Sequence, residues 1–367
     1  MKTLCASWFL LSLVCSATAA DRPRQDPAAI QAYCIDFNWG EGGPNGFARP
    51  GLWAEADPAA HVAWYQSLGA NVMQTFCVSC NGYAWYKHGV VPEQPGLKHD
   101  FLTEAVRRGH QQGLRVMGYF CIGANTRWAQ EHAEFSYGTP SSPHIPYTNK
   151  YLTYLTAAIQ DAVQKTGIDG FMIDWVWQPD RSATHGKWLD CEKDLYAELM
   201  GSVFPGKNNL TPQQKLTYSR KAIERCWIAI HKAAKEVNPD CIIWLSCGNP
   251  TQPYVVNSRM FKEVDWLMNE AGDMERIKAI EPMIGEHTRL LTCLANWNKQ
   301  DPALIIPAAL KAGIGLFGFS RPGPDSLLPP VETYLAQPVD KLQGDAKNIA
   351  FLARAYHGVL GTKGRDQ

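Results

Sequence analysis

The chain alternates short apolar runs with longer stretches in which apolar residues recur every three to four positions, and it does so about eight times. The short runs predict β-strands at 32–38, 70–76, 114–122, 170–177, 241–246, 266–270, 289–296 and 314–320. The longer stretches predict helices at 59–68, 100–112, 150–166, 212–237, 273–284 and 303–311, with a last helical segment at 339–356. Strands that are apolar along their whole length are buried on both faces, as in a parallel sheet covered by helices. Eight such units predict an α/β fold of the (β/α)8, or TIM barrel, type.

Capping residues support these helix limits. Asp57 and Asp301 each precede a proline, an arrangement typical of the first helical turn. Four glycines follow helices and precede strands: Gly69, Gly113, Gly167 and Gly313. The alternative is a doubly wound open sheet, but no GxGxxG motif follows the first strand, so a dinucleotide-binding fold lacks its main signature.

Four long insertions follow the first four strands. They span 39–56, 77–98, 123–149 and 178–211 and are rich in Gly, Pro, Trp, Tyr and His. In a barrel the segments after the strands form the face that carries the active site. No internal repeat or linker divides the chain, so residues 21–367 are predicted to form a single barrel domain.

The first twenty residues are predicted to be a signal peptide. Lys2 precedes an apolar run at 8–14, and small residues at 17–20 resemble a cleavage site. Cys15 raises the alternative of a lipoprotein, although Val14 is a poor fit to the small residue that such processing prefers. No later run approaches the ~20 apolar residues of a membrane span. We therefore expect a secreted or periplasmic protein without a membrane span.

The composition narrows the class of partner. Lys plus Arg and Asp plus Glu number 35 each, so no net field attracts nucleic acid or an anionic membrane. The sequence contains no GxxxxGK[ST], HExxH or GxSxG motif, so phosphoryl transfer, zinc proteolysis and serine hydrolysis have no support. A small, uncharged ligand is the expected partner, and no cofactor is implied.

Nine of the 11 cysteines remain once the signal segment is set aside. Cys34, Cys121, Cys241 and Cys293 lie in apolar strand runs, where a thiol acts as a small buried hydrophobe. Cys77 and Cys80 form a CxxC pair, which favours either a disulfide or two buried thiols. A metal site is the weaker alternative, because structural zinc needs four ligands and no second CxxC is present.

The fourth strand carries the first catalytic candidate. Asp169 directly precedes this strand and Asp174 lies near its end, with Trp175 and Trp177 following. The carboxyl end of a barrel strand is the catalytic end, so Asp169 is expected to cap or pair at the opposite face. Asp174 among aromatic residues suits a sugar site, where a carboxylate meets an oxocarbenium-like transition state. The structural alternative is a buried ion pair with Arg or Lys.

Glycoside hydrolysis needs a second carboxyl group that holds a proton. Glu270 ends the sixth strand and shares its face with Met268 and Trp266, which makes it the candidate acid. The structural alternative for Glu270 is an acid in the first turn of the next helix. Glu192 and Glu93 are weaker candidates for the same role.

Polar and aromatic residues at the other strand ends are predicted to form a sugar-binding wall. Asp36 and Asn38 close the first strand and offer binding groups. The predicted substrate-binding residues are Trp39, Tyr83, Trp85, Tyr119, Trp175, Trp177, Asn296 and Arg321. Tryptophan faces and hydrogen-bonding side chains together suit a hydroxyl-rich ligand.

The first half of the chain resembles a known family. Residues 35–40 (IDFNWG) resemble the first-strand Trp-Gly signature of the family-29 glycoside hydrolases, the α-L-fucosidases, and 112–120 (QGLRVMGYF) follows in the same order. Residues 82–86 (GYAWY) and 95–100 (PGLKHD) resemble the "hypothetical glycosyl hydrolase 6" group more closely. The resemblance extends from about Tyr33 to Trp177.

The resemblance implies roles for particular residues. The fourth-strand aspartate of fucosidases is the nucleophile, which implies that Asp174 is the nucleophile of a retaining mechanism. The His-His-Asp-Gly-Phe run that grips fucose in that family is replaced here by 79–83 (SCNGY), so fucose specificity does not follow.

The hypothesis from the sequence is thus an exported glycoside hydrolase that acts on an oligo- or polysaccharide through Asp174 and Glu270. One alternative is a catalytically inactive barrel that binds carbohydrate. A further alternative is a barrel enzyme that uses Cys77 and Cys80 with a metal.

Overall fold

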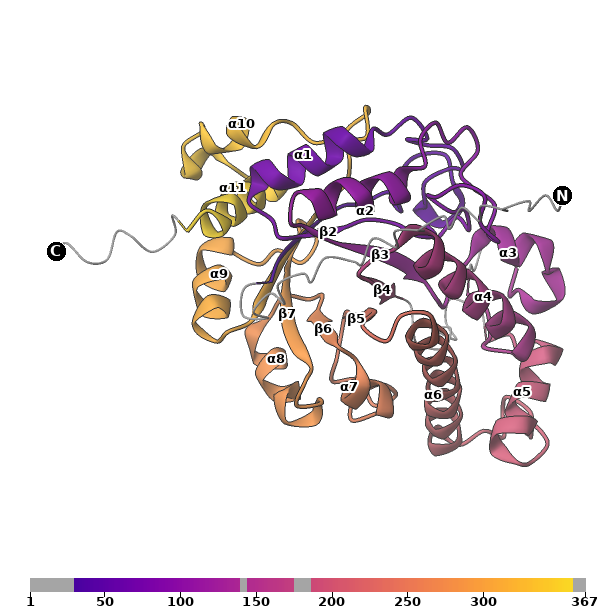
Figure 1. Cartoon of the computed structure of the whole chain (residues 1–367). Coiled ribbons are helices and arrows are strands. Elements are labelled where there is room, and N and C mark those ends of the chain that lie inside the picture. The colour runs from indigo at the N-terminus through magenta and orange to yellow at the C-terminus, as the bar shows by residue number, and fades with distance from the viewer. Residues whose placement is uncertain (1–29, 139–143, 175–185, 359–367) are drawn as a thin grey trace, which may run out of the picture.

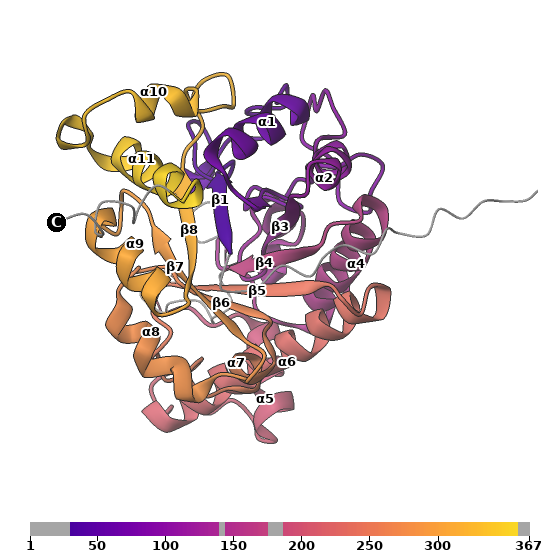
Figure 2. The same ribbon diagram turned by 60° about the vertical axis from the view of Figure 1, so that its left-hand side comes forward.

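The computed structural model describes residues 30–138, 144–174 and 186–358. Eight parallel strands close into a barrel in chain order (Figure 2), which confirms the predicted fold. The strands are β1 (Gln31–Ile35), β2 (Val72–Gln74), β3 (Arg115–Cys121), β4 (Gly170–Asp174), β5 (Ile242–Cys247), β6 (Trp266–Asn269), β7 (Arg289–Leu294) and β8 (Gly315–Ser320). Each lies within or next to a predicted run.

Helices surround the barrel (Figure 1). The helices that the periodicity predicted are α1 (Pro58–Leu68), α2 (Phe101–Gln111), α4 (Asn149–Thr166), α6 (Pro212–Val237), α8 (Met274–Ile280), α9 (Pro302–Lys311) and α11 (Gly344–Tyr356). Turns of 3-10 helix at Glu281–Met283 and Val339–Lys341 account for the remaining predicted helical residues, apart from those at the segment ends. The sequence did not predict α3 (Thr126–Glu131), α5 (Asp190–Met200), α7 (Arg259–Glu263) and α10 (Val331–Leu335), three of which are too short to show an apolar period.

The capping residues act as expected. The Asp57 and Asp301 carboxylates accept hydrogen bonds from the backbone N–H groups of Ala59 and Ala303. Gly69 and Gly167 end α1 and α4 with φ of 79° and 67°, a left-handed conformation that favours glycine. The chain can therefore leave each helix and enter the next strand within a few residues.

Strand register defines which side chains fill the barrel. Trp244 of β5 pairs in register with Trp266 of β6, and its ring lies 5.1 Å from that of Phe317 on β8. Strands β5 and β8 are not neighbours, so these rings meet inside the barrel. Residues paired in register point to the same side of a sheet, and side chains alternate along each strand. The interior rows therefore include Cys34, Gln74, Met117, Tyr119, Met172, Asp174, Ser246, Met268, Leu291, Cys293 and Phe319.

The opposite faces of the strands pack against the helices. Tyr33 of β1 contacts the ring of Trp64 on α1 at 5.2 Å. The Tyr356 hydroxyl of α11 donates to the backbone oxygens of Ala32 and Leu316, at the seam between β1 and β8. Helix α11 thereby fastens the last strand to the first, and it lies beside α1 in both views (Figures 1 and 2).

All nine cysteines of the described part of the chain are free thiols, and all but Cys191 are buried. Cys77 and Cys80 are thus two buried thiols and not a disulfide. Within the described ranges, no group of three or more His, Cys, Asp or Glu side chains could hold a metal ion. A search of the same ranges finds no helix that is both long and apolar enough to span a membrane.

Candidate active site

Asp174 is the last residue of β4. Its position in the interior row directs its side chain into the mouth of the barrel, the opening at the carboxyl ends of the strands. The hydroxyl of Tyr119, from the neighbouring strand β3, donates a hydrogen bond of 2.9 Å to Oδ2 of Asp174. A hydroxyl donor stabilises a carboxylate and fixes its orientation. The arrangement presents a partly exposed, oriented anion at the carboxyl end of the barrel.

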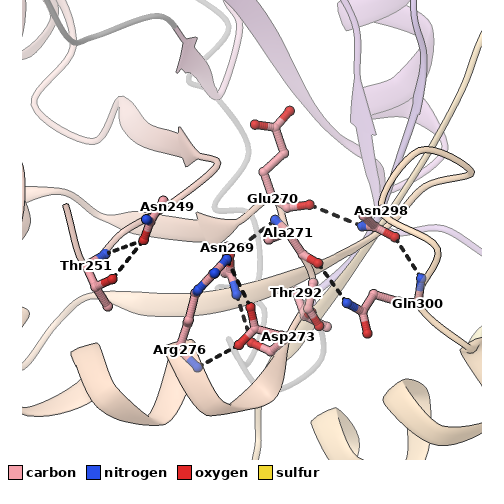
Figure 3. A network of polar contacts seen from close by, with 11 residues as sticks. Asn249, Thr251, Asn269, Glu270, Ala271, Asp273, Arg276, Thr292, Asn298 and Gln300 are labelled. Atoms are coloured by element: carbon pink, nitrogen blue, oxygen red, sulfur yellow. Dashed lines mark hydrogen bonds and ion pairs between the residues drawn. The ribbon is translucent and has the colours of Figure 1, made fainter.

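Glu270 follows β6 directly and is held by its backbone. Its N–H donates to Cys247 O on β5 over 3.0 Å, and its carbonyl accepts a 3.1 Å hydrogen bond from the Asn298 side chain. Figure 3 shows the Glu270 side chain extending away from this polar network. Helix α8 begins only at Met274, with Asp273 as its cap, so Glu270 does not belong to the first turn of that helix.

The Glu270 carboxyl lies over the end of β5. A β carbon added at Gly248, just beyond β5, would lie 3.5 Å from Glu270 Oε2. Strand β5 lies between β4 and β6, so the carboxyl reaches over the strand that separates it from Asp174. Cys247, at the end of β5, experiences the charges of both acids. The two candidate catalytic groups therefore share one mouth.

The electrostatic environment favours the neutral form of Glu270. Burial first, and then the negative charges of Asp174 and Asp36, raise the pKa of Glu270 to about 8. A carboxyl group with such a pKa keeps its proton at neutral pH and can donate it to a leaving group. Asp174, by contrast, is hydrogen-bonded by a hydroxyl that stabilises its anion. The two acids are thus placed in different environments.

Asp36 is a third acid in the same mouth. It follows β1, continues the interior row of Cys34, and is 5% exposed. Its Oδ1 accepts a 2.5 Å hydrogen bond from the Asn38 N–H. Burial and the charge of Asp174 raise the pKa of Asp36 to about 7, while the N–H groups of Asn38 and Trp39 and the charge of Arg321 act in the opposite direction.

Asp169 lies at the other end of β4. Its Oδ2 accepts a 2.8 Å hydrogen bond from the Val116 N–H and lies 2.8 Å from His110 Nε2 of α2. These contacts join β4, β3 and a helix at the amino ends of the strands. The expected division between Asp169 and Asp174 is confirmed for Asp169, which pairs at the structural face.

Tyr119, Trp39 and Tyr83, three of the predicted wall residues, follow or belong to the first three strands. Tyr119 contacts Asp174 directly. Trp39 is partly exposed beside Phe47, with ring centroids 5.0 Å apart. Tyr83 is partly exposed, and the Arg127 guanidinium lies 5.8 Å from its ring centroid. Trp175 and Trp177 lie outside the described residues.

Trp85 lies in the packing layer and not in the sugar-binding wall where the sequence analysis put it. It is 1% exposed, its ring stacks on Phe37 with centroids 4.3 Å apart, and its N–H donates to Ser79 Oγ. Phe37 also contacts the rings of His61 on α1 and Phe101 on α2. Helices α1 and α2 therefore cover Phe37, and Trp85 packs in the same layer, against Phe37 and Phe101.

Asn296 and Arg321 follow β7 and β8 and are exposed. The Asn296 N–H donates to the carboxyl of Asp345, at the start of α11, and Arg321 acts on both Asp345 and Asp36 by its charge. These two residues lie on the β8 side of the mouth. The structure thus places Arg321 close enough to Asp36, one of the acids of the site, for its charge to lower the pKa of Asp36.

The rival acids lie elsewhere. Glu192 is fully buried on α5, and Glu93 forms a bridge with Ala84 in the segment after β2. The charges that raise the pKa of Glu270 come from Asp174 and Asp36. Of the acids proposed from the sequence, Glu270 is the one whose charge is coupled to that of Asp174.

The side chains that fix the backbone at Glu270 and Ala271 were not predicted from the sequence. Asn298 donates to the backbone oxygens of Glu270 and Cys293, and Gln300 donates to Ala271 O (Figure 3). Both side chains come from the loop after β7. A single amide in a loop gives no sign of this role in the sequence, because its partners are backbone oxygens, which every residue has.

A hollow of about 790 Å³ lies at the opposite end of the barrel. Residues of α8, the segment after it and the start of β7 line it, among them Lys278, Glu281 and Arg289. Since the acids described above stand at the carboxyl ends of the strands, this hollow is not part of their site.

The chain is similar to known glycosidases. Residues 57–175 match the model of a family described as hypothetical glycosyl hydrolase 6, which confirms the resemblance inferred from the sequence. A search of curated protein sequences finds no match.

Solved structures share the fold at low sequence identity. The α-L-fucosidase isoenzyme 2 of Paenibacillus thiaminolyticus is 15% identical, with a TM-score of 0.65 over 90% of this chain and 49% of that one, so this chain spans about half its length. The β-galactosidase of the psychrophilic Marinomonas ef1 is 12% identical, with a TM-score of 0.58 over 92% and 61% of the two chains. A fucosyltransferase mutant of the α-L-fucosidase AlfC is 11% identical, with a TM-score of 0.51 over 90% and 97%. At these identities the likeness establishes the barrel fold.

Proposed function

We propose that this protein is a glycoside hydrolase that cleaves glycosidic bonds by a retaining, two-carboxylate mechanism. The observation that carries the proposal is the pairing of Asp174 with Glu270, whose pKa is raised to about 8, at the carboxyl ends of β4 and β6. A glycosidase needs this combination of one ionised and one protonated carboxyl group. The match to the glycosyl hydrolase model over 57–175 supports the same class.

In the first step the Asp174 carboxylate attacks the anomeric carbon while Glu270 donates its proton to the leaving glycosidic oxygen. The C–O bond to the leaving group breaks, and an ester bond to Asp174 forms. In the second step the ionised Glu270 removes a proton from water, whose oxygen attacks the same carbon and releases Asp174. The Tyr119 hydroxyl, 2.9 Å from Oδ2, would orient the nucleophile through both steps.

The substrate proposed is a carbohydrate with a neutral glycon, since a sugar carboxylate would be repelled by the charges of Asp174 and Asp36. Trp39, Tyr83, Asn296 and Arg321 remain the proposed sugar contacts, together with Trp175 and Trp177. The α-L-fucosidases that share the fold make α-L-fucosides one class to include in a substrate screen, beside β-galactosides.

A panel of aryl glycosides, assayed with the wild-type protein and with Asp174→Ala, tests the proposal. We expect release of the aryl group from one or more glycosides and its loss in the variant. Proton NMR of the first product then reports its anomeric form, which is the same as in the substrate for a retaining enzyme. An inverted product would refute the nucleophilic role of Asp174. Binding of sugars without hydrolysis of any glycoside would favour a carbohydrate-binding barrel.

We also propose that the protein is exported and that residues 1–20 are removed, because the basic, apolar and small-residue segments follow the order of a signal peptide. Amino-terminal sequencing of the protein recovered from expressing cells tests this. Recovery of the chain with Met1 or Lys2 as its first residue from the exported fraction would contradict it.

A further inference from the structure

Three carboxyl groups and a guanidinium share the mouth of the barrel, and they are not arranged evenly. Asp36 follows β1, Asp174 ends β4, Glu270 follows β6, and Arg321 follows β8. Asp36 and Asp174 both contribute to the raised pKa of Glu270, and Asp174 contributes to that of Asp36. The mechanism proposed above uses Asp174 and Glu270 and gives no role to Asp36.

Strand order places Arg321 beside Asp36. Strand β1 pairs with β8, with Ile35 opposite Ser320, and the Asp36 N–H continues the ladder by donating to Ser320 O over 2.9 Å. Glu270 is two strands away from β8, with β7 between. Arg321 lowers the pKa of Asp36, whereas the charges acting on Glu270 are those of Asp174 and Asp36. The positive charge of Arg321 therefore stabilises the ionised form of Asp36 more than that of Glu270.

The carboxylate of Asp36 is also held in place. The Asn38 N–H donates to it over 2.5 Å, and the Trp39 N–H donates to it as well. At 5% exposure, the side chain cannot turn out to solvent to relieve repulsion from the other acids. Hydrogen-bond donors of this kind favour the ionised form of a carboxyl group. The Asp36 carboxyl is therefore held in one position at the floor of the mouth.

We propose that Asp36 is a positioning residue that acts through Glu270. With Arg321 beside it, Asp36 stays ionised, and its charge opposes a second anion on β6, so that the proton shared by these acids resides on Glu270. This inference rests on the proposed function, because Glu270 is the group that needs the proton at the start of the reaction.

The other titratable groups around the acids do not compete for this role. Burial raises the pKa of the Cys247 thiol on β5 to about 12 and raises those of Cys34 and Cys293 well above the ordinary value. The Tyr119 hydroxyl on β3 and the Tyr65 hydroxyl on α1 are raised in the same way. All of them keep their protons near neutral pH and carry no charge. Burial raises the pKa of both carboxyl groups, to about 7 for Asp36 and about 8 for Glu270, and at Asp36 the charge of Arg321 acts against this rise.

The arrangement also fits both steps of the reaction. When Glu270 gives up its proton it gains a negative charge, and Asp174 loses one as it forms the ester. The total charge of the three acids is therefore the same before and after the first step. Asp36 stays ionised throughout and favours return of a proton to Glu270 when water attacks.

The test is the pH profile of kcat/KM for wild type and Asp36→Asn, with an aryl glycoside that the wild type hydrolyses. The asparagine can still accept a hydrogen bond from the Asn38 N–H but has no charge. We expect the basic limb of the profile, which reports ionisation of Glu270, to move to lower pH by roughly one unit. A purely structural role for Asp36 would lower the profile without moving its limb, and that result would overturn the inference.

Arg321→Gln provides a second arm if Asp36→Asn does not fold. Without the guanidinium, Asp36 competes for the proton, so the basic limb again moves to lower pH. In the double variant, Arg321→Gln should add no further shift, because its effect passes through Asp36. An equal shift from Arg321→Gln in both backgrounds would contradict this route. Asp169→Asn, at the other end of β4, is the matched control and should leave the limb in place.

A direct titration separates this inference from the proposed function. Carbon-13 NMR of labelled glutamate carboxyls, with Glu270→Gln to assign the signal, measures the pKa of Glu270 without any substrate. A lower value in Asp36→Asn supports the inference even if the wild type hydrolyses none of the glycosides, in which case the proposed function alone fails. An unchanged value refutes the inference while leaving hydrolysis untouched.

Discussion

The two ends of the barrel treat acidic residues in opposite ways. At the amino ends of the strands, Asp169 accepts from the Val116 N–H and lies 2.8 Å from His110, and Asp265 accepts from the Ile243 N–H and pairs with Lys235 at 3.1 Å. At the carboxyl ends, the charges of Asp174 and Asp36 raise the pKa of Glu270, and the charge of Asp174 raises that of Asp36. Acids that have a hydrogen-bonding or ionic partner connect strands and helices. Acids that repel one another have raised pKa values, so they can hold a proton and donate it in catalysis.

The paired end repeats a simple pattern. Asn71, Asp169 and Asp265 each stand just before an even-numbered strand, and each accepts a hydrogen bond from the N–H of a residue at the start of the preceding strand. A polar side chain at this position satisfies a backbone donor that the ladder leaves open. The mouth end has no such repeat, because each of its acids comes from a differently shaped loop. Regularity thus marks the structural end.

The largest expected effect is at Asp174. Asp174→Asn removes the proposed nucleophile with little change in shape, and kcat should fall by on the order of 10⁴-fold. Steady-state kinetics with an aryl glycoside measures it. If Asp169→Asn lowers kcat as much as Asp174→Asn does in a folded protein, the two ends of the barrel do not divide into a structural and a catalytic end.

Glu270→Gln should lower kcat by about 10²- to 10⁴-fold with a poor leaving group, and by much less with a nitrophenolate that needs no proton. Activity of the wild type should fall above about pH 8, where Glu270 loses its proton. A loss that is independent of the leaving group would exclude the acid role.

The same residue should also affect stability. The pKa of Glu270 is raised in the folded state, so its contribution to stability is present below the ordinary pKa of 4.5 and is lost as pH rises toward about 8. Glu270→Gln should therefore gain on the order of 1–2 kcal/mol relative to wild type between pH 5 and pH 9, the partial exposure of the side chain being allowed for. Urea unfolding at both pH values measures this. A constant difference would contradict the raised pKa.

Asn298→Ala should lower kcat by roughly tenfold, because the Asn298 amide holds the Glu270 carbonyl at 3.1 Å and misplacement of an acid weakens proton transfer. Gln300→Ala, which loses a hydrogen bond to Ala271 O instead, is the matched control and should have a smaller effect on kcat. Equal losses in the two variants would show that the loop acts as a whole.

The smallest expected effect on activity is at Asp169. Asp169→Asn loses a charged acceptor for the Val116 N–H and His110, which should cost about 1–3 kcal/mol of stability with little change in kcat. Thermal unfolding measures the loss, about 1–2 °C in Tm per kcal/mol for a domain of this size. Unchanged stability would remove the structural role assigned to this end.

Much of the barrel was predictable because its signals are local. Apolar runs marked every strand, and helix ends were marked by residues such as Asp57, Asp301, Gly69 and Gly167. Short helices such as α7, with five residues, escaped because one turn and a half contains no measurable period. Trp85 escaped in another way: a tryptophan after a strand looks the same in the sequence whether it faces the mouth or packs against Phe37.

The sequence by itself determined the barrel, the end at which Asp169 pairs, and the presence of acids after β1, β4 and β6, because these follow from periodicity and from position along each strand. Only the tertiary structure decided that the Glu270 carboxyl lies over Gly248 at the end of β5, the strand next to β4, and that the register of β1 and β8 places Arg321 next to Asp36. Electrostatic interactions depend on distance in space. The residues that set the protonation of Glu270 are far from it in the sequence, and the closure of the barrel brings them together.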